Sequence, residues 1–298
     1  MKESILRALA YYDVFAYPLT AKEIHQGLDI FSDLSTVSEG LHQLEQEGLL
    51  FKFEEFYTLR DDQNVITKRR AANEKAQLLL SKAHQKANFI SRFPFIRGIA
   101  ISGSLSKNYA DEKSDLDFFI TTHPKRLWIA RTVFILARRM LVAKKNYKNY
   151  CLNYFIAEDL LALDERNLFT ATELTTLIPV FGFGQYQNLM KANGWLSKFL
   201  PNHKVLSMSD ETPPSSWQKR VMEKILDLGG NWLDNFFMNL TLSKMKRRHI
   251  TKYTKEDFAL AFKTERHVSK IHLGNNQKRI LNLYHQRLSE LNVETVTL

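Results

Sequence analysis

The chain has only one cysteine, Cys151, among its 298 residues. A single thiol excludes an intramolecular disulfide and is too few for a cysteine-based zinc site. The nine histidines lack the H-x-x-x-H or H-E-x-x-H spacing of zinc-binding helices, so a histidine-bound zinc is not expected either. The scarcity of cysteine is consistent with a cytoplasmic protein.

Long apolar runs are also missing. The most apolar helical stretch, Leu127 to Ala143, is interrupted by three arginines, which argues against a membrane span. The first 21 residues carry charges at Glu3 and Arg7 and no small-residue cleavage site, so a secretory signal is not expected. We therefore expect a cytoplasmic location and no membrane partner.

Glycine and proline are sparse, at 11 and 7 residues, and the chain contains no internal repeat or low-complexity segment. With 44% hydrophobic and 25% charged residues, this is the composition of a globular protein rather than a disordered one. The motif G-x-x-x-x-G-K-[ST] is absent, which excludes a P-loop nucleotide site. The G-x-S-x-G motif is absent too, which disfavours a hydrolase nucleophile.

Positive charge is abundant. The net charge is +10 and the isoelectric point is near 9.5. Two segments, Lys125–Lys148 and Ser243–Lys255, are rich in basic residues and contain no acidic ones. A polyanionic partner, either a nucleic acid or a nucleoside triphosphate, fits this balance. The alternative for each segment is an ordinary solvated helix face.

Residues 1–62 have the pattern of a compact unit with three helices followed by a small hairpin. Thr20 and Glu23 have the spacing of a capping box at the start of the second helix. Gly48 is expected to end the third helix. Two short strand-like runs within Leu50–Leu59 suggest the hairpin. The order of these elements predicts a winged-helix-like unit.

The rest of the chain divides into three parts. Residues 63–92 are expected to form a connecting helix, and residues 93–165 alternate between strand and helix patterns. Residues 166–298 are expected to be a helical C-terminal domain. The fold class predicted is α+β, with a small mixed sheet flanked by the winged-helix-like unit and the helical region. The helices expected in the C-terminal part are Thr170–Ile178, Gln185–Phe199, Trp217–Met238 and one from Tyr253 or Glu256 to Leu291.

Two short motifs in residues 93–165 suggest a site. An apolar strand, Gly98–Ile101, leads into Ser102-Gly103-Ser104, and a second strand is expected over Asp115–Thr121. Side chains two apart on a strand share a face, so Asp115 and Asp117 are expected to project together. Neighbouring carboxylates repel one another unless a cation lies between them, and Mg²⁺ or Mn²⁺ is the natural candidate.

The turn supplies groups that suit phosphate. Gly103 has no side chain to keep a triphosphate away, and it can adopt backbone angles that other residues avoid. The hydroxyl of Ser104 can donate to a phosphate oxygen at the start of a short helix. Lys107, one turn later, can reach a phosphate as well, although a surface lysine is the alternative.

Together, Gly103-Ser104 and the pair Asp115/Asp117, separated by ten residues and flanked by apolar strands, resemble the signature of the DNA polymerase beta-like nucleotidyltransferase superfamily. The resemblance covers Arg97 to Ile156. It implies nucleotide binding by Gly103 and Ser104, and catalytic, metal-binding roles for Asp115 and Asp117; Lys107 is a further nucleotide-binding candidate, named from its position alone. The alternative is a strand whose two aspartates face solvent.

The chain departs from the superfamily at a third position. The resemblance implies a further carboxylate on the strand Tyr150–Ile156, where this sequence has Asn153. An amide can ligate a metal but cannot act as a general base. The nearby candidates for a base are Glu158, Asp159 and Glu173. Each has a structural alternative: a turn for the first two, and for Glu173 a capping box with Thr170.

Two functions follow as hypotheses. The first is a Mg²⁺-dependent nucleotidyltransferase that moves a nucleoside monophosphate to an unidentified hydroxyl or phosphate, on a nucleic acid or a small molecule. The second is a nucleotide-sensing regulator, acting by DNA binding or protein docking, with weakened catalysis. The expected recognition helix, Thr36–Glu47, contains three glutamates and no lysine or arginine, which argues against DNA readout. The oligomeric state is not predicted.

Overall fold

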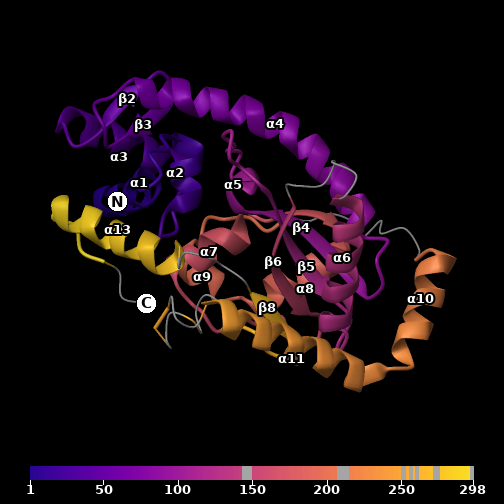
Figure 1. Ribbon diagram of the computed structural model, residues 1–298. Coiled ribbons are helices and arrows are strands. Elements are labelled where there is room, and N and C mark those ends of the chain that lie inside the picture. Colours follow the sequence, from indigo (N-terminus) through magenta and orange to yellow (C-terminus); the bar gives the residue numbers. More distant parts are fainter. Residues whose placement is uncertain are drawn as a thin grey trace.

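The structure is a computed structural model with mixed α and β elements in two small sheets (Figure 1). It describes residues 1–142, 150–206, 215–249, 253–254, 258, 262–270 and 276–295, without the side chains of residues 140–142, 150–153 and 249. The α+β prediction is confirmed at this level. Among the described residues, no helix combines the length and apolar character needed to cross a membrane.

The N-terminal unit consists of three helices and a three-stranded antiparallel sheet with the order β1-β3-β2. Both hydrogen bonds of the predicted capping box between Thr20 and Glu23 are present. Gly48 follows the third helix with φ +70°, as expected for a residue that ends a helix. The elements are α1 (Lys2–Asp13), β1 (Leu19–Thr20), α2 (Ala21–Gly27), α3 (Leu34–Gln46), β2 (Phe51–Phe53) and β3 (Phe56–Thr58).

A long helix, α4 (Asn64–Ile90), connects this unit to the second sheet, as predicted. In Figure 1 it arches over the molecule from the hairpin to the start of the central sheet. Its inward face is made of small residues, of which Ala76, Ala83 and Ala87 are fully buried in the main core. Alanine costs little side-chain entropy in a helix and allows close packing, which suits a long bridging element.

The central sheet has five strands in the order β7-β4-β5-β6-β8. Only β5 and β6 are parallel; the other neighbours are antiparallel. The helix α6 (Leu127–Val142), formed by the apolar helical stretch seen in the sequence, makes the crossover between the two parallel strands. The strands are β4 (Ile96–Ser102), β5 (Leu116–Thr122), β6 (Tyr150–Ala157), β7 (Ile178–Phe181) and β8 (Val268–Lys270).

The prediction of a nearly all-helical region over residues 166–298 is wrong in part, because β7 and β8 from this region form the two edges of the central sheet. The strand β8 lies inside the helix expected from Tyr253 or Glu256 to Leu291. Two of the expected helices are also divided: one around Asn193, and one at Leu228–Gly229, ahead of Gly230 with φ +46°. The helices are α5 (Gly103–Ser106), α7 (Leu168–Thr175), α8 (Phe183–Ala192), α9 (Leu196–Phe199), α10 (Trp217–Asp227), α11 (Gly230–His249) and α13 (Asn276–Glu290).

The last helix returns to the N-terminal unit. In Figure 1, α13 lies beside α1, and buried side chains of both helices share one apolar cluster. A buried aspartate, Asp13, joins them: its carboxylate accepts hydrogen bonds from Arg60 at 2.7 Å and from Arg287 at 2.8 Å. Segments from both ends of the chain are thereby held together.

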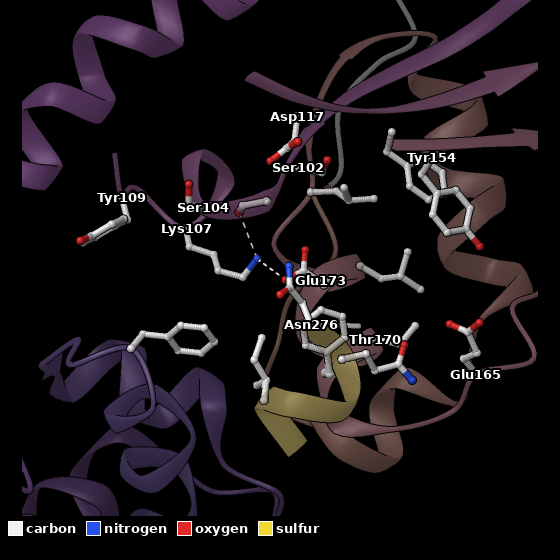
Figure 2. A pocket seen from close by; sticks show the side chains of 18 of the residues that line it. Ser102, Ser104, Lys107, Tyr109, Asp117, Tyr154, Glu165, Thr170, Glu173 and Asn276 are labelled. Atoms are coloured by element: carbon white, nitrogen blue, oxygen red, sulfur yellow. Dashed lines mark hydrogen bonds and ion pairs between the residues drawn. The ribbon is translucent and has the colours of Figure 1, made fainter. Parts of the chain in front are cut away.

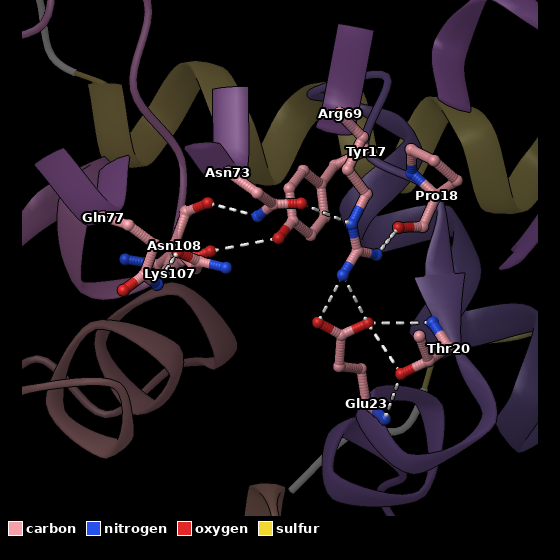
Figure 3. Close-up of polar contacts among 9 residues, drawn as sticks. All are labelled: Tyr17, Pro18, Thr20, Glu23, Arg69, Asn73, Gln77, Lys107 and Asn108. Carbon is pink, nitrogen blue, oxygen red and sulfur yellow. Dashed lines mark hydrogen bonds and ion pairs between the residues drawn. The ribbon is translucent and has the colours of Figure 1, made fainter. Parts of the chain in front are cut away.

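Arg69 on α4 is the centre of a second junction (Figure 3). Its buried guanidinium donates to both carboxylate oxygens of Glu23, at 2.6 and 2.9 Å, and to the carbonyl of Pro18. The same guanidinium lies 4.3 Å from the ring centre of Tyr17. Arg69 lies on α4, and its partners are Glu23 on α2 and Pro18, just before β1. It therefore holds the N-terminal unit against the connecting helix.

We expect Arg69→Met to lower the free energy of unfolding by about 2–4 kcal/mol, because it leaves a partly buried Glu23 and a carbonyl without their donor. Arg70→Met is the matched control. Arg70 pairs with Glu54 and Glu55, and all three side chains are exposed to solvent, which screens their charges, so little or no loss of stability is expected. Urea unfolding of both variants measures the difference. Equal losses would show that the Arg69 junction does not stabilise the fold.

Candidate functional site

The turn after β4 brings the first sequence motif against the second. In the antiparallel register of β4 and β5, Ser102 lies directly opposite Asp117. Gly103 follows with φ +70°, which is a left-handed conformation that L side chains rarely adopt. A Cβ atom placed on Gly103 would collide with Oδ2 of Asp117 and lie 3.1 Å from its Cγ. The Asp117 carboxylate therefore packs directly against Gly103, and any larger residue at position 103 would displace it.

This turn forms one wall of a cavity of about 500 Å³. Figure 2 shows Asp117, Ser102 and Ser104 grouped on one side and Glu173 facing them from α7. The cavity has the size of ordinary small-molecule sites, which run from roughly 300 to 1,000 Å³. Its lining includes every sequence-predicted nucleotide-binding residue, namely Gly103, Ser104 and Lys107.

Lys107 lies between the turn and the opposite wall. Its Nζ donates to the carbonyl oxygen of Gly103 at 3.1 Å and to Oε1 of Glu173 at 2.8 Å. The hydroxyl of Tyr17 in turn donates to the Lys107 carbonyl at 3.1 Å. Lys107 is therefore a positioned cation inside the cavity rather than a free surface lysine.

The expected capping box at Glu173 is wrong. The helix α7 begins earlier, at Leu168, and its N-cap is Asn167, whose side chain accepts from the backbone N–H of Thr170. Glu173 consequently lies inside the helix, and its carboxylate points into the cavity toward Lys107. Of the three candidate bases, it is the one that lines the cavity.

The other two candidates lie elsewhere. Glu158 accepts a hydrogen bond from Gln185 at 2.7 Å, and burial raises the pKa of its carboxyl group. Asp159 is exposed. Neither residue lines the cavity described above.

The remaining predicted positions are Asp115 and Asn153. Asp115 lies just before β5, is exposed, and is not part of the cavity wall. Asp117, in contrast, is half-buried and lines the cavity, so the two carboxylates have different surroundings. Asn153 belongs to β6, and its side chain lies outside the described residues. The structure thus brings Gly103, Ser104, Lys107 and Asp117 together and places Asp115 at their edge.

The lining of the cavity is also rich in aromatic side chains. The rings of Phe119 and Tyr154, on neighbouring strands, are stacked with centres 4.7 Å apart and an angle of 14° between them. Burial raises the pKa of Tyr11 well above its usual value, and the nearby carboxylate of Glu173 raises it further. Burial also raises the pKa of Tyr12 and Tyr154. These phenols therefore stay neutral near pH 7 and offer flat apolar faces.

Several lining residues have no signal in the sequence, because they come from segments far from the two motifs. The N-terminal unit contributes tyrosines, and the C-terminal region contributes Lys270, which forms an ion pair with Glu165 at 2.5 Å. The apolar residues in these segments recur at the spacing of ordinary strands and helices, so the sequence gives no indication that they line a site. The lining residues not predicted include Tyr11, Tyr12, Phe15, Tyr17, Tyr109, Tyr154, Glu165, Phe169, Lys270, Asn276 and Gln277.

The donor set suits a cation that arrives with a triphosphate. Within the described part of the chain, no three histidine, cysteine, aspartate or glutamate side chains gather as a metal-binding group. Mg²⁺ commonly uses one or two protein carboxylates and takes its other ligands from phosphate and water. Asp117, with Asp115 two residues before it, fits that requirement.

Comparison with known proteins provides no relative: no family model matches the chain, and no similar curated protein or solved structure was found. The function must therefore be argued from the site itself.

Variants of the Lys107–Glu173 pair test whether Lys107 binds phosphate. Lys107→Gln is expected to weaken triphosphate binding about tenfold, the effect of losing one charge-assisted hydrogen bond. Glu173→Gln is expected to strengthen triphosphate binding severalfold, because Lys107 would no longer have to give up its ion pair with Glu173 in order to bind a phosphate. Calorimetric titration with each nucleoside triphosphate measures both changes. A similar weakening in both variants would instead assign the pair a purely structural role.

Proposed function

We propose that the protein is a Mg²⁺-dependent nucleotidyltransferase that moves a nucleoside monophosphate from a triphosphate to a hydroxyl or phosphate acceptor. The observation that carries this proposal is the contact between the Asp117 carboxylate and Gly103, at the wall of a cavity large enough for a nucleotide. A phosphate-binding turn and a carboxylate at one place are the two groups that nucleotidyl transfer requires.

Each residue has a distinct role in this proposal. The hydroxyl of Ser104 and the ammonium of Lys107 bind phosphate oxygens, and the missing side chain of Gly103 leaves room for the Asp117 carboxylate beside them. Asp117, assisted by Asp115, holds Mg²⁺, which supplies charge neutralisation for the phosphates and the leaving pyrophosphate. The aromatic wall offers stacking surfaces for a planar base.

Glu173 is the candidate proton acceptor. It lies in the cavity, and its partner Lys107 is the cation expected to move toward the triphosphate. That exchange would leave the Glu173 carboxylate free to accept the proton of an attacking hydroxyl. Carboxylates commonly serve as general bases when they are placed within reach of the acceptor.

The finer fold assignment belongs to the same proposal. We assign residues 93–165 to a nucleotidyltransferase core. We assign residues 1–62 to a winged-helix arrangement, supported by three helices and a sheet of order β1-β3-β2. In this arrangement α3 would be the recognition helix, and its exposed face carries Glu39 and Glu45 without a lysine or arginine. The hairpin tip is acidic and is paired with Arg70. These charges favour docking within the protein over DNA binding.

The proposal is tested by incubating the purified protein with Mg²⁺ and each labelled triphosphate, with and without co-purified RNA. Pyrophosphate release, self-labelling or transfer to RNA is the expected result, and it should disappear in the double variant Asp115→Asn/Asp117→Asn with the fold intact. Activity that persists in the double variant would refute the assignment. A shift assay with the full chain tests the regulator alternative, for which we expect no sequence-specific DNA binding even at low salt.

A further inference from the structure

From Trp217 to Leu240, α10, α11 and the connection between them expose large apolar side chains that recur every three or four residues. On α10 these residues recur at intervals of four, which places them on one side of the helix. Exposure is high: 67% for Trp217, 89% for Leu228 in the connection and 72% for Trp232. In Figure 1 both helices lie at the edge of the molecule, joined at a corner. The line, here called the apolar ridge, consists of Trp217, Val221, Ile225, Leu228, Trp232, Phe236 and Leu240.

The inner faces of the same helices are firmly attached, so the ridge is not the exposed side of a detached segment. The buried ammonium of Lys219 donates to the carbonyls of Ser91 and Ile96, at 2.8 and 2.7 Å. On α11, Leu233 and Phe237 pack against the main core. The orientation of both helices is therefore determined by their other side.

The acidic residues of α10 and α11 are all engaged with neighbours. Glu223 forms an ion pair with Arg97 at 2.8 Å, and Asp227 forms one with Arg126. The carboxylate of Asp234 accepts from the backbone N–H groups of residues 128 and 129, at 2.9 and 3.0 Å. No carboxylate of these two helices is left to offset the charge of their exposed cations.

Two of those cations, Arg220 and Lys224, lie on α10, and four more lie together at the end of the ridge. Lys244, Lys246, Arg247 and Arg248 are exposed on the last turns of α11, beyond Leu240. Desolvation, followed by the charges of three nearby arginines, lowers the pKa of Lys244. Among the described residues no ion pair neutralises any of the four. The surface of α10 and α11 thus exposes large apolar side chains along both helices and carries a group of four cations at one end.

The apolar ridge and the cations beside it restrict which class of molecule can bind to this surface. A second copy of the chain would bring another net charge of +10 against the same surface. Single-stranded nucleic acid could stack on the tryptophans, but it would leave aliphatic residues such as Ile225 and Leu228 without an apolar partner. A lipid surface with anionic headgroups satisfies both parts: the interface accepts tryptophan and aliphatic side chains, and the headgroups attract the cations.

We propose that the outward face of α10 and α11 binds anionic membranes, so that the protein lies on a bilayer without crossing it. The ridge inserts at the level of the headgroups, and the basic end of α11 contacts the anionic lipid. This revises the expectation of no membrane partner. It does not depend on the proposed nucleotidyl transfer, because the ridge is formed by residues outside the cavity lining.

The test is sedimentation of the full-length protein with vesicles of phosphatidylcholine alone and of phosphatidylcholine mixed with phosphatidylglycerol. We expect binding only to the mixed vesicles, and less of it at high salt. Leu228→Gln/Trp232→Gln and Lys244→Glu/Arg247→Glu should each reduce binding about tenfold or more. The matched controls are Leu78→Gln and Lys82→Glu on α4, where Leu78 is 71% exposed, and both should bind like the wild type.

Tryptophan fluorescence locates the contact. Brominated lipid should quench Trp217 and Trp232 in wild-type protein, whereas the buried Trp128 should stay protected. Equal binding by the ridge variants and the controls would overturn the proposal. Two other results, obtained without vesicle binding, would also overturn it. One is self-association of the wild type that is lost in Leu228→Gln/Trp232→Gln, and the other is binding of single-stranded RNA. Circular dichroism confirms that each variant is folded.

Discussion

Replacing Gly103 with alanine is expected to abolish triphosphate binding in a protein that still folds. The backbone at this position has φ +70°, which costs an L residue about 1–2 kcal/mol. The new methyl group would also occupy the place of the Asp117 carboxylate and displace it. Displacing a metal-binding group by about an ångström is enough to reduce activity roughly a hundredfold, and we expect at least this loss here.

Gly48→Ala is the matched control for Gly103→Ala. Gly48 has the same φ of +70°, but no heavy atom lies within 4 Å of the position its Cβ would take. Gly48→Ala should therefore lose only the stability that the backbone conformation costs, whereas Gly103→Ala should lose more, because it also displaces Asp117; urea unfolding measures both, and only Gly103→Ala should lose triphosphate binding. Equal triphosphate affinity in the two variants would show that contact between Gly103 and Asp117 has no functional meaning.

Asp117→Asn is expected to lower nucleotidyl transfer about a thousandfold or more, because a metal ligand contributes several kcal/mol to the stabilisation of transferring phosphates. Asp115→Asn should have a clearly smaller effect, about tenfold, since Asp115 is exposed and outside the cavity wall. Rates of pyrophosphate release measure both variants at saturating Mg²⁺. Equal losses would mean that the two carboxylates act as a symmetric pair, as the sequence spacing alone suggested.

Much of the fold follows from local patterns. The capping box at Thr20, the long helix α4, the crossover helix α6 and the strands around the Gly-Ser turn were all predictable, because each depends on residues close together in the chain. The two edge strands were not. Pro179 argues against a strand, but β7 is an edge strand, where a missing N–H is tolerated. The strand β8 is only three residues long.

The site was predictable in part, for a similar reason. The residue types at Gly103, Ser104 and Asp117 suggested phosphate and metal chemistry. Their contact, however, depends on the antiparallel register of β4 and β5, which no local pattern specifies. The role of Glu173 was obscured because Asn167 and Thr170 are both good helix caps, and the helix uses the earlier one. The tyrosines of the N-terminal unit join the cavity only through tertiary packing.

The most direct test of the account is a calorimetric titration of the wild-type protein and of Asp117→Asn with each nucleoside triphosphate, with and without Mg²⁺. We expect the wild type to bind at least one triphosphate in a Mg²⁺-dependent manner and the variant to lose the Mg²⁺-dependent part. Binding that is the same with and without Mg²⁺ in both proteins, or no binding of any triphosphate, would contradict a metal–triphosphate site at Gly103, Ser104 and Asp117.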